Sequence, residues 1–297
     1  MRVVIAGSSG LLGRHLSDEL VHRGHAVIAL VRRPTSAPDE SFWDPQAGTV
    51  DDAVIAAADV VVNLAGASMV GIPHSPRWQG GMRESRISST RVLAESIARA
   101  ERPPAFLAQN GSSYYGDHGA EVVTEDSDSR GDAFLTVLTR DWQAAADPAV
   151  QAGARVCVMR TPPVADRANP LVKLLVPVFK TFLGARLGNG RQYFPVISMH
   201  DWVGAAVHLL EHPSASGVFN MCSPQTPTNA EWTRAFARAV SRPAFLVAPA
   251  PLLNLAAGPM APEMLNSINL RPAALEAAGY RFRDRTVDQV IAAALHR

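Results

Sequence analysis

A glycine-rich segment near the start of the chain has the spacing of a phosphate-binding loop. The apolar run at 2–6 leads into Gly7, and Gly10 and Gly13 follow at intervals of three residues. In such a loop the first glycine permits a tight turn, the second lets the backbone approach a diphosphate, and the third allows close packing of helix on strand. The helix N-terminus then offers free N–H groups and the positive end of its dipole.

The neighbours of this loop decide whether it is more than a strand–helix turn. Residues 2–6 are predicted as a buried strand, 11–23 carry a helical stripe of leucines, and 26–31 are predicted as a second buried strand. That order is the context that a dinucleotide-binding loop requires. We therefore predict that a dinucleotide diphosphate is held by these loop residues: Gly7, Ser9, Gly10, Leu11, Leu12 and Gly13.

Two arginines follow the second predicted strand, where dinucleotide-binding folds contact the adenosine ribose. A protein specific for NAD places Asp or Glu there, whereas this chain has Arg32 and Arg33. A guanidinium can form paired hydrogen bonds to a phosphate. The sequence therefore favours NADP as cofactor, with both arginines on its 2′-phosphate. The alternative is an ordinary basic strand end.

Apolar runs and helical patterns alternate through the first half of the chain. Beyond those already named, strands are predicted at 58–64, 105–109 and 155–159, and helices at 82–101 and 134–152. Such alternation is typical of a parallel sheet that is covered on both faces. We therefore predict an α/β protein with a doubly wound Rossmann sheet.

The pattern changes after residue 160. Residues 171–183 are predicted as an amphipathic helix, and 243–270 show no clear period. We predict an NADP-binding Rossmann domain at 1–165, with its sheet completed by about 196–223. A smaller C-terminal substrate domain is expected from two segments, 166–195 and 224–297.

Composition narrows the class of protein. The chain has 297 residues, 47% hydrophobic and 19% charged, and its 28 basic and 27 acidic residues give a net charge of +1. This balance supplies no excess positive charge that would favour binding to nucleic acid. No apolar stretch is long enough for a membrane helix.

The sequence also predicts no metal site, because it has only two cysteines and no ligand-like spacing of His, Asp or Glu. We expect a cytoplasmic protein with a small-molecule substrate, and a homodimer only on general grounds.

Several motifs resemble the short-chain dehydrogenase/reductase superfamily. The glycine loop and Asn63-Leu64-Ala65-Gly66 are similar to the superfamily as a whole, and the chain length is similar to its extended branch of nucleotide-sugar epimerases. The resemblance implies that Leu64, Ala65 and Gly66 line the cofactor cleft. Further motifs resemble an atypical subgroup, the epimerase family proteins: Trp43-Asp44-Pro45, Ser85-Arg86, Thr90-Arg91, Tyr114-Tyr115-Gly116-Asp117, Arg140-Asp141-Trp142 and Thr228-Asn229-Ala230-Glu231.

The superfamily's catalytic pair is missing from this chain. Its members move a proton with Tyr-x-x-x-Lys, in which the lysine and the cofactor lower the tyrosine pKa so that the phenolate can act as a base. None of the four tyrosines here has a lysine four residues later, and the positions expected for the pair hold Leu135 and Thr139.

A polar segment after the fourth predicted strand supplies the remaining catalytic candidates. The serine that usually precedes Tyr-Tyr-Gly in the family is replaced here by Asn110, whose amide can still donate to a carbonyl oxygen. Ser113 is a further hydroxyl that could substitute if the loop shifts, and packing within a loop is an equal alternative for the tyrosines. The candidates near the nicotinamide are Asn110, Ser112, Tyr114 and Tyr115.

Two features are expected on the substrate side of the cleft. Residues Ser68 to Gly81, with Trp78, are predicted as a long loop, and loops that leave strand C-termini line the active cleft in this fold. Arg86 is a candidate for contact with the substrate, and a surface salt bridge is the alternative.

The sequence thus predicts an NADP(H)-dependent oxidoreductase or epimerase-like enzyme of the extended short-chain type. Its substrate would be an unidentified carbonyl compound or a nucleotide-sugar-like molecule. The alternative is a non-catalytic NADP(H)-binding sensor or interaction protein that has lost the Tyr-x-x-x-Lys pair.

Overall fold

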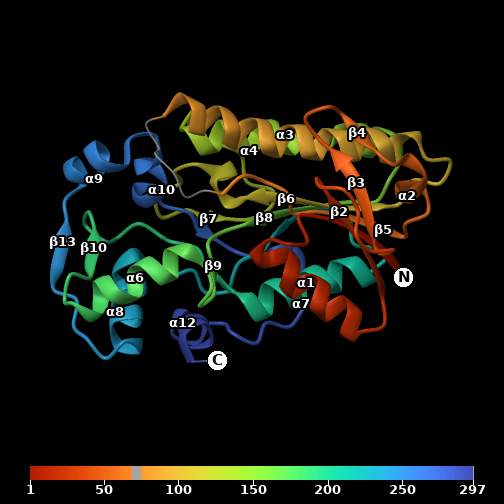
Figure 1. The fold of residues 1–297 in the computed structure, drawn as a ribbon. Coiled ribbons are helices and arrows are strands. Elements are labelled where there is room, and N and C mark those ends of the chain that lie inside the picture. Colours follow the sequence, from red (N-terminus) through yellow and green to blue (C-terminus); the bar gives the residue numbers. More distant parts are fainter. Residues whose placement is uncertain (69–74, 297) are drawn as a thin grey trace.

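A computed structural model of the chain describes residues 1–68 and 75–296, and its centre is an eight-stranded sheet (Figure 1). The strands are β1 (Arg2–Ala6), β2 (Ala26–Val31), β3 (Glu40–Asp44), β4 (Thr49–Val50), β5 (Val60–Asn63), β6 (Ala105–Gly111), β8 (Val156–Thr161) and β12 (Gly217–Asn220). They lie in the order β12-β8-β6-β5-β1-β2-β3-β4. All neighbours are parallel except β3 and β4. The predicted Rossmann-type sheet is therefore confirmed.

The inner strands are apolar along their whole length because both faces of the sheet are covered. In β1, Val3 and Ile5 point into the core on one side, and Val4 and Ala6 point into the core on the other. All four are 0% exposed. Burying each of the branched side chains contributes about 1.5–3 kcal/mol to stability.

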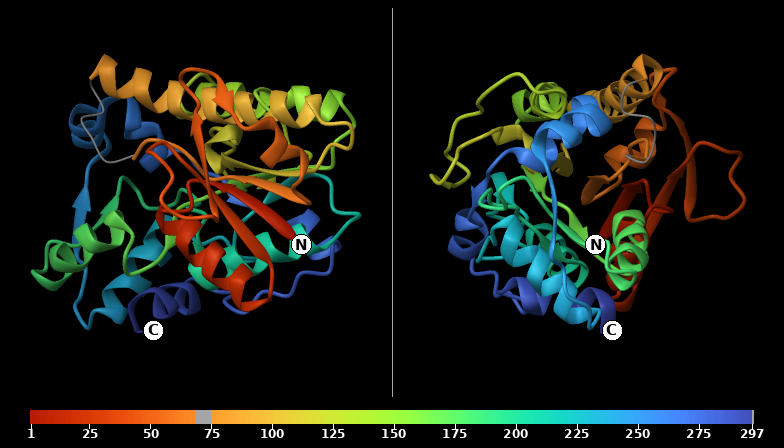
Figure 2. Two further views of the ribbon diagram at one scale, coloured as in Figure 1. Left: turned by 45° about the vertical axis from the view of Figure 1, so that its right-hand side comes forward. Right: turned by 90° about the vertical axis from the view of Figure 1, so that its left-hand side faces the viewer.

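Two layers of helices enclose the sheet (Figure 2). Helices α1 (Leu11–His22) and α7 (Met199–Glu211) cover one face. The other face is covered by α2 (Asp52–Ala56), α3 (Pro76–Arg99), α4 (Phe134–Ala144) and α5 (Asp147–Gln151). In this arrangement β1 and β5 are neighbours, and the segments that follow them leave toward opposite faces of the sheet. The crevice between two such strands is where α/β sheets bind ligands.

The remaining elements gather mainly beyond the carboxyl ends of the central strands (Figure 1). The helices are α6 (Pro170–Lys180), α8 (Asn229–Ala239), α9 (Ala250–Ala257), α10 (Ala261–Leu265), α11 (Ala273–Ala277) and α12 (Val287–His296), with 3-10 turns η1 (Ser112–Tyr115) and η2 (Gly258–Met260). The short strands form three parallel pairs: β9 (Val164–Ala165) with β11 (Ile197–Ser198), β10 (Ala185–Leu187) with β13 (Leu246–Ala248), and β7 (Val122–Val123) with β14 (Asn269–Leu270).

Helices α6, α8 and α12 share a small apolar core of their own. Phe179 and Phe236 face each other there with ring centroids 4.7 Å apart. Helix α8 begins at a capping box in which Thr228 and Glu231 satisfy each other's backbone N–H groups. The division into two domains at residue 165 stays a prediction.

Several predicted boundaries were wrong. The predicted helix at 134–152 is two helices, and Pro148, which lacks an N–H, stands in the first turn of the second. The predicted loop from Ser68 to Gly81 ends earlier than expected, because Ser75 accepts a hydrogen bond from the Trp78 N–H and α3 starts at Pro76. The rest of that loop, 69–74, lies outside the described residues.

Gly13 offers a direct test of how α1 is seated on β1. A Cβ at this position would lie 2.1 Å from the carbonyl oxygen of Gly7. We expect Gly13→Ala to lower the free energy of unfolding by about 1–3 kcal/mol, because backbone must move to make room.

The matched control is Gly80→Ala. Gly80 is exposed in the first turns of α3 and a Cβ there meets nothing within 4 Å. This change should stabilise the protein by about 0.5–1 kcal/mol. Urea unfolding of both variants measures the difference, and equal stability of the two would contradict the described packing.

Candidate functional site

The glycine loop brings β1, β5 and α1 together more closely than side chains would allow. Gly7 has φ +83°, and a Cβ on it would lie 2.7 Å from the carbonyl carbon of Leu64 and 2.8 Å from the nitrogen of Ala65. A Cβ at Gly10 would lie 3.2 Å from the Gly7 oxygen. The loop is thus a cradle of bare backbone at the carboxyl end of β1.

The N-terminus of α1 opens into this cradle with unused hydrogen-bond donors. Gly10 is the N-cap and provides no side-chain cap, while its own N–H bonds to the Gly7 oxygen at 3.0 Å. Among the described residues, nothing accepts from the backbone N–H groups of Leu11, Leu12 or Gly13. These donors and the helix dipole fit a diphosphate, and its binding there stays a prediction.

The turn after β5 forms the opposite wall and is held by buried polar side chains. Asn63 is 0% exposed, and its Oδ1 accepts from the Ala65 N–H at 3.0 Å. Its Nδ2 donates to Thr90 Oγ1 at 2.9 Å, and Trp142 Nε1 donates to the same oxygen at 2.8 Å. This network fixes Leu64 and Ala65 against the glycine loop.

The two arginines after β2 have different surroundings. The Arg33 guanidinium is bound by Glu40, at 2.9 and 2.5 Å to its two carboxylate oxygens, and this contact lowers the Glu40 pKa to about 2. Arg32 is exposed, and in the described part of the chain no hydrogen bond or ion pair engages its guanidinium. Arg32 is therefore the free cation at the end of β2, and Arg33 is already partnered.

Arg86 is half-buried beside the same turn and forms no salt bridge with any residue that the structure describes. Its guanidinium donates to the carbonyl oxygens of Ala67 and Met82, and it lies 5.3 Å from the ring of Trp142. Burial lowers its pKa to about 10. A Cβ at Gly66 would lie 3.3 Å from this side chain, so Arg86 supports the turn from behind.

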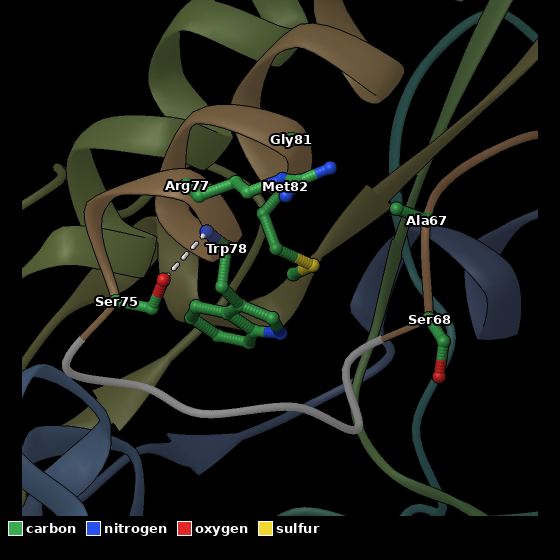
Figure 3. A pocket seen from close by; sticks show the side chains of 7 residues that line it. All are labelled: Ala67, Ser68, Ser75, Arg77, Trp78, Gly81 and Met82. Atoms are coloured by element: carbon green, nitrogen blue, oxygen red, sulfur yellow. Dashed lines mark hydrogen bonds between the residues drawn. The ribbon is translucent and has the colours of Figure 1, made fainter.

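A pocket opens between this turn and the start of α3 (Figure 3). Ala67 and Ser68 form one side of it, and Trp78 and Met82 point in from the helix. Trp78 also packs on Phe134, with ring centroids 6.0 Å apart. Trp78 was predicted in a loop that lines the cleft, but it lies in α3 and lines this pocket.

The two tyrosines after β6 differ sharply in exposure. Tyr115 is 0% exposed, and its hydroxyl donates to Asn220 Oδ1 at 2.7 Å. Burial raises its pKa to about 12. Tyr114 is half-buried, and its hydroxyl has no partner among the described residues. The geometry makes Tyr115 a packing residue and leaves Tyr114 as the accessible phenol.

A buried arginine that the sequence analysis missed lies against both rings. Arg160 is 3% exposed, and its guanidinium carbon lies 3.5 Å from the ring centroid of Tyr114 and 4.8 Å from that of Tyr115. Two of its nitrogens donate to Gln143, while the third has no hydrogen-bond partner among residues 1–68 and 75–296. One feature of the sequence could have identified Arg160 as a site residue. It stands at the end of β8, next to β6, and the carboxyl ends of parallel strands meet at one edge of the sheet.

The polar side chains of Asn110 and Ser112 also differ: that of Asn110 supports the fold, and the hydroxyl of Ser112 is available to a ligand. Asn110 is 1% exposed; its amide donates to the Thr139 oxygen at 3.1 Å and its Oδ1 accepts from Gly111 at 2.7 Å. This side chain ties β6 to α4, and one of the two N–H groups of its amide is used in that contact. Its part in catalysis stays a prediction. Ser112 is 6% exposed, and no described residue pairs with its hydroxyl.

The place of the superfamily's proton-transfer pair is closed. Leu135 packs with Met82 and Leu138 in an apolar cluster. Thr139 turns its hydroxyl to the Leu135 and Thr136 oxygens, and its methyl group would lie 3.1 Å from a Cβ at Gly111. A proton must therefore move through other groups if the site is catalytic.

The fold and this site define a Rossmann-type nucleotide-binding protein, and comparison with known families makes the class specific. Residues 3–222 match the NAD dependent epimerase/dehydratase family, so the chain belongs to that family. Residues 248–294 match a second family, a domain of unknown function called DUF1731. The resemblance found in the sequence motifs is thereby confirmed.

Relatives and solved structures narrow the family further. "Epimerase family protein Mb2239" of Mycobacterium bovis is 38% identical over 99% of this chain and 98% of its own. The crystal structure of human epimerase family protein SDR39U1 with NADPH has a TM-score of 0.87 at 29% identity and covers 99% of both chains. A nucleoside-diphosphate sugar epimerase from Corynebacterium glutamicum has a TM-score of 0.81 at 31% identity, covering 99% of this chain and 58% of that one.

Two further features are absent from the described residues. No helix there is both long and apolar enough to cross a membrane. Nor do three His, Cys, Asp or Glu residues in that part of the chain approach closely enough to hold a metal ion.

The contrast between the tyrosines predicts different effects of removing their hydroxyls. Tyr115→Phe should lower the free energy of unfolding by about 1–3 kcal/mol, since it leaves the buried oxygen of Asn220 without its donor. Tyr114→Phe, the matched control, should change it by less than about 0.5 kcal/mol. Chemical unfolding measures both, and the reverse order would show that the described placement of the two rings is incorrect.

Proposed function

We propose that this protein is an NADP(H)-dependent oxidoreductase or epimerase-like enzyme that acts on a carbonyl or nucleotide-sugar-like substrate. The observation that carries the proposal is the bare-backbone cradle between β1 and β5, with three unpaired N–H groups at the start of α1. A diphosphate satisfies these donors, and few other ligands need so much exposed backbone.

The preference for NADP over NAD rests on Arg32. A free guanidinium at the end of β2 suits a 2′-phosphate, and no carboxylate of β2 stands ready for a ribose hydroxyl. Arg33 would act indirectly, because Glu40 already holds it. The human relative was solved with NADPH, which supports the same choice of cofactor here.

The chain's own residues would bind and orient the reactants. The α1 N-terminus would hold the diphosphate, Arg32 the 2′-phosphate, and the turn at Leu64, Ala65 and Gly66 the edge of the cleft. The bound nicotinamide supplies hydride transfer, and the protein positions a carbonyl against it. Ser112 and Tyr114 have unpartnered hydroxyls at this edge and would donate hydrogen bonds to the substrate oxygen.

A second candidate is a non-catalytic NADP(H)-binding sensor or interaction protein. The closed space around Leu135 and Thr139 favours it, since the superfamily's proton-transfer pair has no room there. Consumption of NADPH with any member of a panel of ketones and nucleotide sugars supports the enzyme. Tight binding without consumption across the panel supports the sensor.

Titration of the single arginine variants tests the cofactor assignment. We expect the chain to bind NADPH more tightly than NADH, as measured by nicotinamide fluorescence. Arg32→Ala should weaken NADPH binding by about 10- to 100-fold, the share of one charge-assisted contact, and leave NADH binding unchanged. Arg33→Ala is the matched control and should have a smaller effect. Failure of wild-type protein to bind either nucleotide would overturn the proposed function.

A further inference from the structure

One contact joins the segment after β6 to the C-terminal region across 150 residues of sequence. Ser113 Oγ donates a hydrogen bond to Glu263 Oε2 at 2.5 Å. Ser113 lies in η1, directly after the carboxyl end of β6, and Glu263 lies in α10, which sits beyond that end of the sheet (Figure 1). The pair therefore occupies the edge of the sheet where the proposed cofactor cleft opens.

The carboxyl group has the properties of a proton donor and acceptor near neutral pH. Both residues are half-buried, so the pair is shielded from bulk water but keeps partial contact with solvent. Burial raises the pKa of Glu263 to about 6, and the Ser113 hydrogen bond opposes part of that rise. General acids and bases work best when their pKa lies near the working pH.

The charged groups on the helix that packs beside α10 and η2 are engaged with other partners. Helix α4 packs on η2, next to α10, and carries Arg140 and Asp141. Arg140 donates to the carbonyl oxygen of Gly131, and Asp141 is paired with Arg83 at 2.5 Å. Within residues 1–68 and 75–296, no cation forms an ion pair with Glu263. Its carboxyl group can thus exchange a proton without first breaking a salt bridge.

We propose that Ser113 and Glu263 are the proton-transfer pair of this chain, standing in for the missing Tyr-x-x-x-Lys. The inference rests on the proposed function and names its catalytic groups. Ser113 gives its hydroxyl proton to the substrate oxygen, which Ser112 and Tyr114 help to hold. Glu263 acts through Ser113 as a positioning residue and proton store.

The step balances with the proposed cofactor as reductant. The substrate carbonyl is reduced as its carbon gains a hydride and its C=O π pair moves to oxygen, while the nicotinamide is oxidised. That oxygen takes the hydroxyl proton of Ser113, and Ser113 takes the carboxyl proton of Glu263. Glu263 is left as a carboxylate and regains a proton from water, which its partial exposure allows. The reverse sequence oxidises an alcohol.

The first test measures the carboxyl group itself, without cofactor or substrate. In full-length protein labelled with carbon-13 at glutamate side-chain carboxyls, we expect one NMR resonance to titrate near pH 6. Glu263→Gln should remove that resonance, and Ser113→Ala should move its midpoint to higher pH, because the serine hydrogen bond stabilises the carboxylate. Absence of any carboxyl that titrates near pH 6 and depends on Ser113 overturns the proposal.

The same group makes a signed prediction for stability. The folded-state pKa of about 6 lies above the ordinary value of 4.5, so the folded protein binds this proton more tightly than the unfolded chain does. The stabilisation is present below pH 4.5 and is lost as pH rises through about 6. Thermal unfolding should show that Glu263→Gln removes this part of the pH dependence, while the exposed-site control Glu84→Gln retains it.

The second test separates a proton relay from a merely structural contact. Phenanthrenequinone serves as a reactive carbonyl probe, and single-turnover loss of NADPH absorbance is followed from pH 5 to 8. The wild-type rate should fall above about pH 6. Glu263→Gln and Ser113→Ala should lower it about 100-fold or more, with a flat profile and unchanged NADPH affinity. Ser113→Thr restores a hydroxyl and should recover activity, and Glu84→Gln should match wild type.

The possible outcomes distinguish this inference from the proposed function. A Glu263→Gln variant with the wild-type rate and pH profile overturns the pair. A wild-type protein that binds NADPH but reduces none of the probe also overturns it, because the relay should protonate any carbonyl that reaches Ser113. A wild-type protein that binds no NADPH refutes the proposed function instead, and the NMR titration then decides on the pair alone.

Discussion

The close approach of three backbone segments at the ends of β1 and β5 is the constraint on which the rest of this structure depends. Gly7 and Gly13 leave no room for a Cβ, so the strand, the helix and the neighbouring turn meet as bare backbone. The approach leaves the first N–H groups of α1 unpaired and aimed into the opening. The packing of α1 on β1 and the proposed binding of a diphosphate therefore depend on the same backbone contact. A side chain at Gly7 or Gly13 would disturb both.

The polar groups around this opening divide into those that build it and those that remain available. Asn63, Thr90 and Trp142 form a buried chain of hydrogen bonds that holds the turn after β5. On the other side of the opening, Asn110 and Tyr115 likewise form hydrogen bonds within the fold. Among the described residues, the hydroxyls of Ser112 and Tyr114 have no partner, so they are available to a ligand beside the Ser113–Glu263 pair.

The loss of the superfamily's tyrosine and lysine is accompanied by a rearranged edge of the sheet. Leu135 and Thr139 fill their places with apolar packing and an internal hydrogen bond. Arg160 lies over the Tyr114 ring, and Glu263 reaches Ser113 from the C-terminal region. These two groups come from different elements, and under the proposed relay Glu263 would give the C-terminal region a direct part in the site.

The sequence predicted the regular part of the fold because long apolar runs and helical stripes are visible in one dimension. It missed the strand at Glu40–Asp44, in which Ser41 is buried and Phe42 is exposed, so hydrophobicity does not mark its inner face. It also missed the short elements within 243–270, which depend on tertiary contacts. Family, fold and the glycine loop were readable. The pairing of Arg33 with Glu40 and of Ser113 with Glu263 was not, because only folding brings those side chains together.

The most direct test of the central claim is a crystal structure of this chain grown with NADP⁺. The claim predicts the diphosphate over the N–H groups of Leu11, Leu12 and Gly13, the 2′-phosphate on Arg32, and the nicotinamide toward Ser113. Density for the dinucleotide elsewhere, or a cradle that excludes it at saturating concentration, would contradict the claim.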